Sequence, residues 1–179
     1  MHLPNKLTIF RIILVPFFVV FMKVPVGGEK IHRYIALMIF IMASLTDYLD
    51  GYIARRDNLV TDFGQLMDPL ADKLLICTAM ICLIDTDQLP SWIVIVIISR
   101  EFIISGFRLI AANNRIVIAA SQQGKLKTIS QMAMIFFLLV NLKGNIGYVL
   151  EQILIYLTLA LTVISLIGYL YKNKQVMSS

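Results

Sequence analysis

Six apolar runs, several of them close to 20 residues long, constrain what this chain can fold into. A run of about 20 apolar residues is long enough to cross the roughly 30 Å hydrocarbon core of a bilayer as a helix. The hydrophobic fraction is 59%, whereas about 45–50% is usual in soluble domains. We therefore expect an all-α integral membrane protein with six transmembrane helices, at residues 7–24, 34–54, 68–84, 92–112, 121–142 and 146–171.

Length and charge narrow the possible classes of protein further. The 179 residues leave room for one compact membrane domain, so we expect a single domain over residues 1–179. The net charge of +5 is typical of a protein whose basic residues flank membrane spans and meet anionic lipid headgroups. A nucleic-acid partner is not expected, because no basic stripe interleaved with aromatic residues is present. The expected surroundings are membrane lipids.

The distribution of lysine and arginine around the six runs predicts the orientation in the cell membrane. Basic residues accumulate on the cytoplasmic side of membrane proteins. The alternating topology puts ten on one side, namely Lys6, Arg11, Arg55, Arg56, Arg108, Arg115, Lys125, Lys127, Lys172 and Lys174. The other side has four, namely Lys23, Lys30, Arg33 and Lys143. We therefore expect both termini in the cytoplasm.

Four aspartates, at positions 47, 50, 68 and 72, lie within 26 residues of this apolar chain. Asp47 and Asp50 are three apart and Asp68 and Asp72 are four apart, so on helices each pair shares one face. Carboxylates this close repel one another and resist desolvation. Divalent cations would neutralise them, since oxygen ligands suit magnesium, manganese or calcium. The spacing therefore predicts a metal site, which the topology puts near the cytoplasmic membrane surface.

The start of the third helix is left open by the sequence. Pro69 can stand in the first turn of a helix capped by Asp68. Alternatively the helix begins earlier, with Thr61 or Asp62 as its cap, and Pro69 bends it by removing one backbone hydrogen bond.

Basic residues inside the fourth and fifth runs predict a binding pocket for phosphate. Arg100 and Arg108 are eight residues apart and share a helical face. A charge within the hydrocarbon region is costly and usually faces the protein interior or a wet cavity. With Lys125 and Lys127, these arginines would form a basic pocket beside the aspartates that suits a phosphate-bearing soluble substrate. The alternative is an Arg100–Glu101 pair that satisfies itself, which we disfavour because adjacent helical residues point in different directions.

A polar repeat opens the chain. Asn5, Thr8 and Arg11 recur every three residues and would share one helical face. The repeat is compatible with a functional polar face and equally with a capped helix start whose arginine extends toward the interface.

The aspartates belong to a longer pattern. Residues from Asp47 to Asp72 match D-x-x-D-G-x-x-A-R-(x8)-G-x-x-x-D-x-x-x-D at every position, which resembles the signature of the CDP-alcohol phosphatidyltransferase family. Segments 3–8, 68–73, 99–101 and 124–128 resemble the bacterial branch of that family whose acceptor is sn-glycerol 3-phosphate. The resemblance implies transfer of a phosphatidyl group from CDP-diacylglycerol to sn-glycerol 3-phosphate, with release of CMP. It also implies a homodimer of six-helix subunits with a cytoplasm-facing polar cavity.

The resemblance also implies roles for individual residues. Two divalent ions, Mg²⁺ or Mn²⁺, would be held by Asp47, Asp50, Asp68 and Asp72. Asp72 would in addition act as the general base. The CDP-lipid would be bound by Gly51, Ala54, Arg55 and Gly64. The acceptor phosphate would meet the basic set Arg100, Arg108, Lys125 and Lys127.

Three other functions compete with this interpretation. The same chemistry with another alcohol acceptor, such as inositol phosphate or serine, differs only in the acceptor pocket. A divalent-cation transporter would place its aspartates near the bilayer midplane, whereas these lie at span ends. A non-catalytic lipid-binding scaffold would have no use for Asp72.

Overall fold

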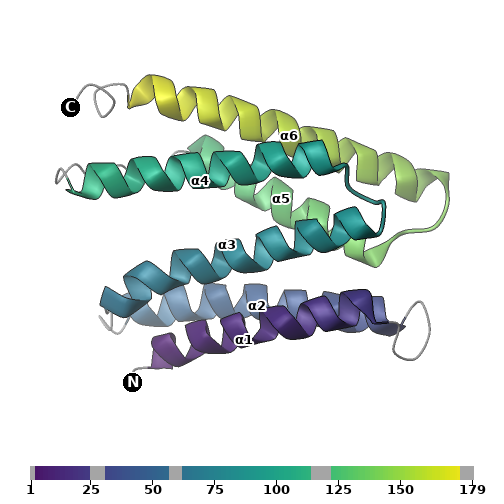
Figure 1. Ribbon diagram of the computed structural model, residues 1–179, viewed down its shortest axis with the longest axis horizontal. Helices are drawn as coiled ribbons and strands as arrows, with labels where there is room; N and C mark the ends of the chain where they lie inside the picture. The colour runs from purple at the N-terminus through teal and green to yellow at the C-terminus, as the bar shows by residue number, and fades with distance from the viewer. Residues whose placement is uncertain (1–2, 25–30, 57–61, 114–121, 174–179) are drawn as a thin grey trace. The chain divides into compact units, whose positions relative to one another are not determined.

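The computed structural model describes residues 3–24, 31–56, 62–113 and 122–173, with side chains for all of these except 3–4, 48–56, 62–66 and 112–113. The regular structure of these residues consists of helices only (Figure 1). The six helices are α1 (Leu3–Lys23), α2 (Ile31–Arg56), α3 (Asp62–Asp85), α4 (Ser91–Asn113), α5 (Gln122–Val140) and α6 (Asn145–Lys172). The expected all-α fold is confirmed, with one helix for each apolar run.

α1 and α3 differ most from the helix starts that the apolar runs indicate. α1 begins at Leu3 rather than at residue 7, and α3 begins at Asp62 rather than at residue 68. The added residues include the polar Asn5, Lys6, Asp62 and Gln65, which interrupt the apolar pattern although they continue the helical backbone. Pro69 therefore lies inside α3, and Asp68 is a residue of the helix and not its cap.

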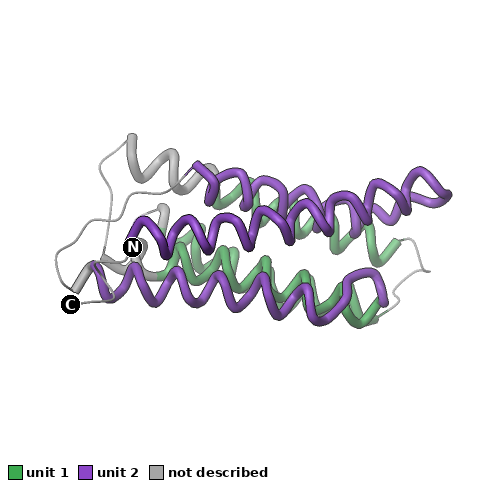
Figure 2. The backbone as a smooth tube through the Cα atoms, turned by 90° about the horizontal axis from the view of Figure 1, so that it is seen from above, with its two compact units in different colours: residues 1–86 green, residues 87–179 purple. Residues whose placement is uncertain are grey.

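The chain divides into two compact units, and the first contains α1, α2 and α3 (Figure 2). Within this unit, Met1–Thr86, α1 packs against both other helices. Ala36 of α2 and Ala71 of α3 are fully buried, and such small residues let helix backbones approach closely. Phe18 of α1 and Phe40 of α2 fill the contact, with ring centroids 6.4 Å apart.

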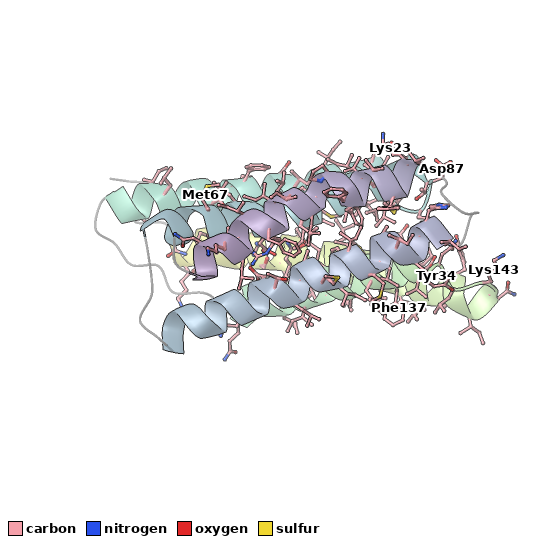
Figure 3. The ribbon with its side chains drawn as sticks, turned by 90° about the horizontal axis from the view of Figure 1, so that it is seen from below. Lys23, Tyr34, Met67, Asp87, Phe137 and Lys143 are labelled. Carbon is pink, nitrogen blue, oxygen red and sulfur yellow. The ribbon has the colours of Figure 1, made fainter. Side chains whose placement is uncertain are left out.

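The two ends of this unit differ in character. At one end, Lys23 Nζ lies 3.0 Å from Asp85 Oδ2, and both side chains are about half exposed. Met67, which directly precedes Asp68 in α3, lies toward the opposite end from Lys23 (Figure 3). The polar candidates of the unit therefore belong to the end that carries the start of α1 and the start of α3.

The second unit, Asp87–Ser179, contains α4, α5 and α6, and α6 packs against both other helices. The buried positions of α6 recur every three or four residues and are mostly small or polar, namely Gly147, Glu151, Ile155, Thr158, Thr162, Ser165 and Tyr169. Ser130 of α5 and Thr158 of α6 share a hydrogen bond of 2.8 Å between their hydroxyls. Such hydroxyl pairs join helices where water is absent.

A tight turn joins α5 to α6. Asn141 has φ 51° and Gly144 has φ 101°, so both adopt left-handed backbone conformations. Gly147 then passes directly over the turn, since a Cβ atom built on it would lie 2.2 Å from the carbonyl oxygen of Leu142. Only glycine fits at position 147 without movement of this turn.

The outward faces of the helices are apolar. On α6, Ile146, Ile153, Ile164 and Ile167 are exposed while the hydroxyl residues face inward. This polarity is the reverse of a soluble protein's, and it suits a lipid environment. Among the described residues, two helices, over Asn5–Lys23 and Asn145–Lys172, are long and apolar enough to cross a bilayer. The protein is therefore an all-α integral membrane protein.

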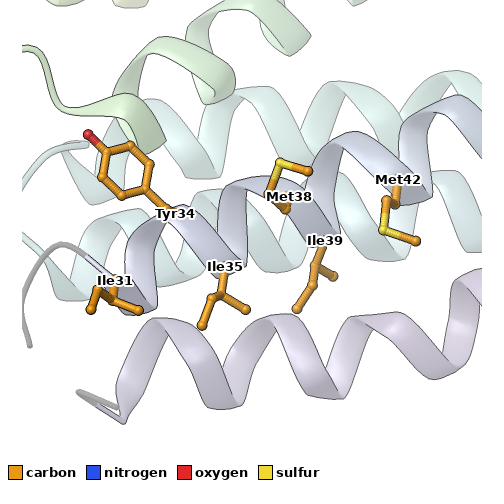
Figure 4. A pocket seen from close by; sticks show the side chains of 6 residues that line it. All are labelled: Ile31, Tyr34, Ile35, Met38, Ile39 and Met42. Atoms are coloured by element: carbon orange, nitrogen blue, oxygen red, sulfur yellow. The ribbon is translucent and has the colours of Figure 1, made fainter. Parts of the chain in front are cut away.

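The first half of α2 lines an apolar pocket of about 420 Å³ (Figure 4). Its lining consists of Ile31, Tyr34, Ile35, Met38, Ile39 and Met42. None of these is a candidate site residue, and Asp47 lies further along the helix. We assign the pocket no part in the chemistry.

Candidate active site

A buried polar stripe on α1 connects the two helices that carry the aspartates. Asn5, Thr8 and Arg11 are 8%, 0% and 0% exposed. Thr8 Oγ1 donates a hydrogen bond to Asp68 Oδ1 over 2.5 Å. Arg11 Nη1 donates to Asp47 Oδ1, also over 2.5 Å. The repeat, whose role the sequence left open, is thus part of the candidate site, because two of its three members donate hydrogen bonds to candidate metal ligands.

These contacts bring together two aspartates that are 21 residues apart in the chain. Thr8 and Arg11 are neighbours on one face of α1, so their partners Asp68 of α3 and Asp47 of α2 approach the same stretch of that helix. Asp47 also lies within electrostatic reach of Asp68. Asp72 follows Asp68 by one turn of α3 and is partly buried. All four predicted metal ligands therefore lie on helices that pack against α1, and the side chains of three of them, Asp47, Asp68 and Asp72, are described.

The remaining predicted residues of the signature lie outside the described side chains. These are Asp50, Gly51, Ala54 and Arg55 of α2 and Gly64 of α3. Their roles stay predictions.

The described carboxylates have the chemistry that a hard divalent cation requires. Each ionised carboxylate has two oxygens and about four acceptor sites, so one bond to Thr8 or Arg11 leaves capacity for a metal. Asp47 is 39% exposed, which leaves it accessible. Among the described side chains, which do not include Asp50, no group of three or more acidic, histidine or cysteine residues gathers closely enough to hold an ion. The donor set fits magnesium or manganese.

A second polar cluster lies within the second unit and joins all three of its helices. Arg100 of α4 is 7% exposed and Lys127 of α5 is 1% exposed. Glu101 Oε1 accepts hydrogen bonds from both, at 3.1 Å from Arg100 Nη1 and at shorter range from Lys127 Nζ. Ser165 Oγ of α6 accepts from Arg100 Nε at 3.2 Å and from Nη2 at 2.9 Å. Lys127 Nζ also donates to Gln131 Oε1.

This cluster changes the interpretation of the Arg100–Glu101 pair. The two side chains do pair, although adjacent helical residues diverge by about 100°. The pair does not satisfy itself alone, because Lys127 shares the same carboxylate oxygen. Arg100 and Lys127 thus share one carboxylate oxygen, whereas Arg108 and Lys125 are exposed on α4 and α5, and the phosphate-binding role of all four stays a prediction.

Sequence reasoning missed the central position of Glu101 and the roles of Gln131 and Ser165. Lys127 and Gln131 are four residues apart, so their contact was detectable from helical spacing. Ser165 is 65 residues from Arg100, and no local pattern indicates that contact. The prediction that the basic set lies beside the aspartates stays a prediction, since the two groups belong to different units.

Comparison with known proteins extends the similarity to most of the chain. The family model for CDP-alcohol phosphatidyltransferase matches residues 1–164. A CDP-diacylglycerol--glycerol-3-phosphate 3-phosphatidyltransferase of Bacillus subtilis is 43% identical over 183 residues, covering 96% of this chain and 95% of its own. Proteins of the same name from Haemophilus influenzae and Rickettsia typhi are 39% and 37% identical, covering 97% and 95% of this chain and 94% of each relative. With these matches and the aspartate pattern on α2 and α3, the chain belongs to the CDP-alcohol phosphatidyltransferase family.

Proposed function

We propose that this enzyme is a phosphatidylglycerophosphate synthase. It transfers the phosphatidyl group of CDP-diacylglycerol to sn-glycerol 3-phosphate and releases CMP. The observation that carries the proposal is near-full-length similarity, at 37–43% identity, to three relatives named for this reaction. The buried cationic cluster of the second unit supports an anionic acceptor.

The reaction is a substitution at phosphorus. A hydroxyl oxygen of glycerol 3-phosphate attacks the phosphorus that carries the diacylglycerol, and the P–O bond to CMP breaks. The hydroxyl proton passes to Asp72, which acts as general base one turn beyond Asp68. The electron pair of the broken P–O bond leaves with the CMP phosphate, so charge and atoms balance.

The family generally depends on a divalent metal. In this chain Asp47, Asp50, Asp68 and Asp72 would hold two ions, Mg²⁺ or Mn²⁺. Bound there, the ions would supply charge stabilisation for the attacking and leaving oxygens. Thr8 and Arg11 orient Asp68 and Asp47 toward α1, which keeps the two carboxylates together.

Binding of the two substrates is divided between the polar regions of the chain. Gly51, Ala54, Arg55 and Gly64 would bind the CDP-lipid, with the glycines leaving room for the nucleotide. Arg100, Arg108, Lys125 and Lys127 would bind the phosphate of the acceptor. Separate sites keep the two anionic substrates apart until the attacking oxygen is in place.

The proposed arrangement in the cell membrane follows from the charges and the substrates. All six helices would cross the bilayer as a single catalytic domain over residues 1–179, with both termini and a polar cavity facing the cytoplasm. There the cavity meets a lipid from the bilayer and a soluble phosphate ester from the cytosol. Two copies would form a homodimer.

The test is CMP release from CDP-diacylglycerol by the purified protein with different alcohols. We expect turnover with sn-glycerol 3-phosphate and none with inositol phosphate or serine. Turnover with another alcohol, and none with glycerol 3-phosphate, would contradict the proposed acceptor. Divalent-cation flux into proteoliposomes without any CMP release would contradict the enzymatic function and indicate a transporter.

A further inference from the structure

We propose that Glu101 is a positioning residue for the acceptor phosphate, which holds Arg100 and Lys127 together in one fixed arrangement. The inference rests on the proposed function, because it takes these two cations to be part of the acceptor site. Glu101 itself is an anion and would repel the phosphate. Its part is therefore to place the cations that bind, and not to bind.

The contacts of one carboxylate oxygen carry this inference. Glu101 Oε1 accepts from Arg100 Nη1 on its own helix and from Lys127 Nζ on α5. Its side chain is 17% exposed, so water screens these contacts little. Two cations from two helices thus converge on a single atom.

Charge explains why a carboxylate is needed at this position. Arg100 and Lys127 carry one positive charge each and are almost fully buried, so without an anion between them they would repel and resist desolvation. With Glu101 the cluster has two positive charges and one negative, which leaves a net charge of +1. That residual charge attracts a phosphate, while the carboxylate lowers the cost of keeping both cations in the protein interior.

The remaining contacts fix the direction of each cation. Ser165 Oγ accepts from two nitrogens of Arg100 and donates to the carbonyl of Thr162, so the guanidinium plane is fastened to α6. Gln131 Oε1 fastens Lys127 from its other side. Among the described contacts of Arg100, three of its five N–H groups are used, and two are left for an anion.

Two cations that are already held in place lower the entropic cost of binding the phosphate. Lysine and arginine side chains lose considerable rotamer freedom when they are ordered on binding. Here the protein has ordered them beforehand, so more of the binding energy of the phosphate remains available for the reaction. Loss of Glu101 should therefore affect the use of glycerol 3-phosphate and leave the use of the lipid intact.

The test compares Michaelis constants for the two substrates in the full-length protein. Initial rates of CMP release are measured with glycerol 3-phosphate varied at saturating CDP-diacylglycerol, and then the reverse. For Glu101→Gln, which keeps the shape and removes the charge, we expect KM for glycerol 3-phosphate to rise about 10- to 100-fold, the range for losing a charge-assisted hydrogen bond. KM for CDP-diacylglycerol should stay at the wild-type value.

Two further variants make the test independent of folding defects. Glu151→Gln removes another buried carboxylate of the second unit, outside the cluster, and should leave both constants unchanged. Ser165→Ala removes the two bonds to Arg100 and adds no bulk, and we expect a smaller rise, about 3- to 10-fold, again only for glycerol 3-phosphate. Thermal unfolding of each variant monitors stability.

Three outcomes would overturn the inference. If Glu101→Gln and Ser165→Ala change both Michaelis constants equally, the cluster only supports the fold. If Glu101→Gln lowers KM for glycerol 3-phosphate, the carboxylate merely opposes the phosphate. If the wild-type protein releases no CMP with glycerol 3-phosphate, the proposed function itself fails, which is distinct from the first two results.

Discussion

Arg11 on α1 and Asp47 on α2 form an ion pair of 2.5 Å between Nη1 and Oδ1, with the arginine side chain fully buried. A buried arginine needs a partner, and here the partner is a predicted metal ligand. The site therefore contains a counter-charge of its own in addition to any metal. Arg11 would hold the Asp47 carboxylate in place when metal is removed.

We expect Arg11→Met to destabilise the metal-free protein by about 1–3 kcal/mol. Breaking a fully buried pair costs about 3–5 kcal/mol, and the partial exposure of Asp47 reduces that figure. Unfolding in detergent with a chelator present measures the effect. The double variant with Asp47→Asn should regain part of the loss, and simple addition of the two single effects would contradict the pairing.

Replacement of Thr8 by valine should lower turnover, because Asp68 loses the hydroxyl that orients it. The two side chains have nearly the same shape, so the core should stay packed. We expect kcat to fall about 10- to 100-fold, as for loss of one hydrogen bond to a charged group. Thr8→Ser keeps the hydroxyl and serves as control. Equal activity of the valine and serine variants would show that the contact is dispensable.

Asp72→Asn should nearly abolish transfer while metal binding persists. A general base contributes about 10²- to 10⁴-fold to the rate, and asparagine cannot accept the proton. CMP release measures the rate, and electron paramagnetic resonance of added Mn²⁺ measures binding. Asp85→Asn, at the other end of the same helix, is the matched control. Full activity of Asp72→Asn would favour a different base.

Arg108→Ala should weaken the use of glycerol 3-phosphate more than that of the lipid. Its guanidinium is exposed on α4 and belongs to the proposed acceptor set. We expect KM for glycerol 3-phosphate to rise about 10-fold or more. Lys143→Ala removes an exposed cation beyond the far end of α5 and should change neither constant. An equal rise for both substrates would count against an acceptor role for Arg108.

Two glycines of the second unit should respond to alanine in opposite directions. Gly147→Ala places a Cβ against the carbonyl of Leu142 and should destabilise by about 1–3 kcal/mol. A Cβ on Gly106 of α4 meets no atom within 4 Å, so alanine there should stabilise by up to about 1 kcal/mol. The melting temperatures in detergent test both. A lower melting temperature for the Gly106 variant would contradict this packing.

The helices were largely predictable from sequence because their signal is local. Each apolar run of the right length identified one helix, even though Pro16 interrupts the run of α1 and Arg100 interrupts the run of α4. The first residues of α1, among them Asn5 and Lys6, were missed, since the apolar pattern begins only after them. For Pro69, two helix starts satisfied the same local rules, and only the structure distinguished them.

The sequence by itself determined the family, the spacing of the four aspartates and the presence of basic residues in an apolar chain, because motif spacing and composition are properties of neighbouring residues. Only the tertiary structure decided that Thr8 and Arg11 contact Asp68 and Asp47, and that Glu101 joins Arg100 to Lys127. Most of these contacts join residues 26 to 60 positions apart. They depend on which helix faces pack together. Many side chains along each helix are long enough and suitably charged to form such contacts, so the sequence alone does not identify the pairs.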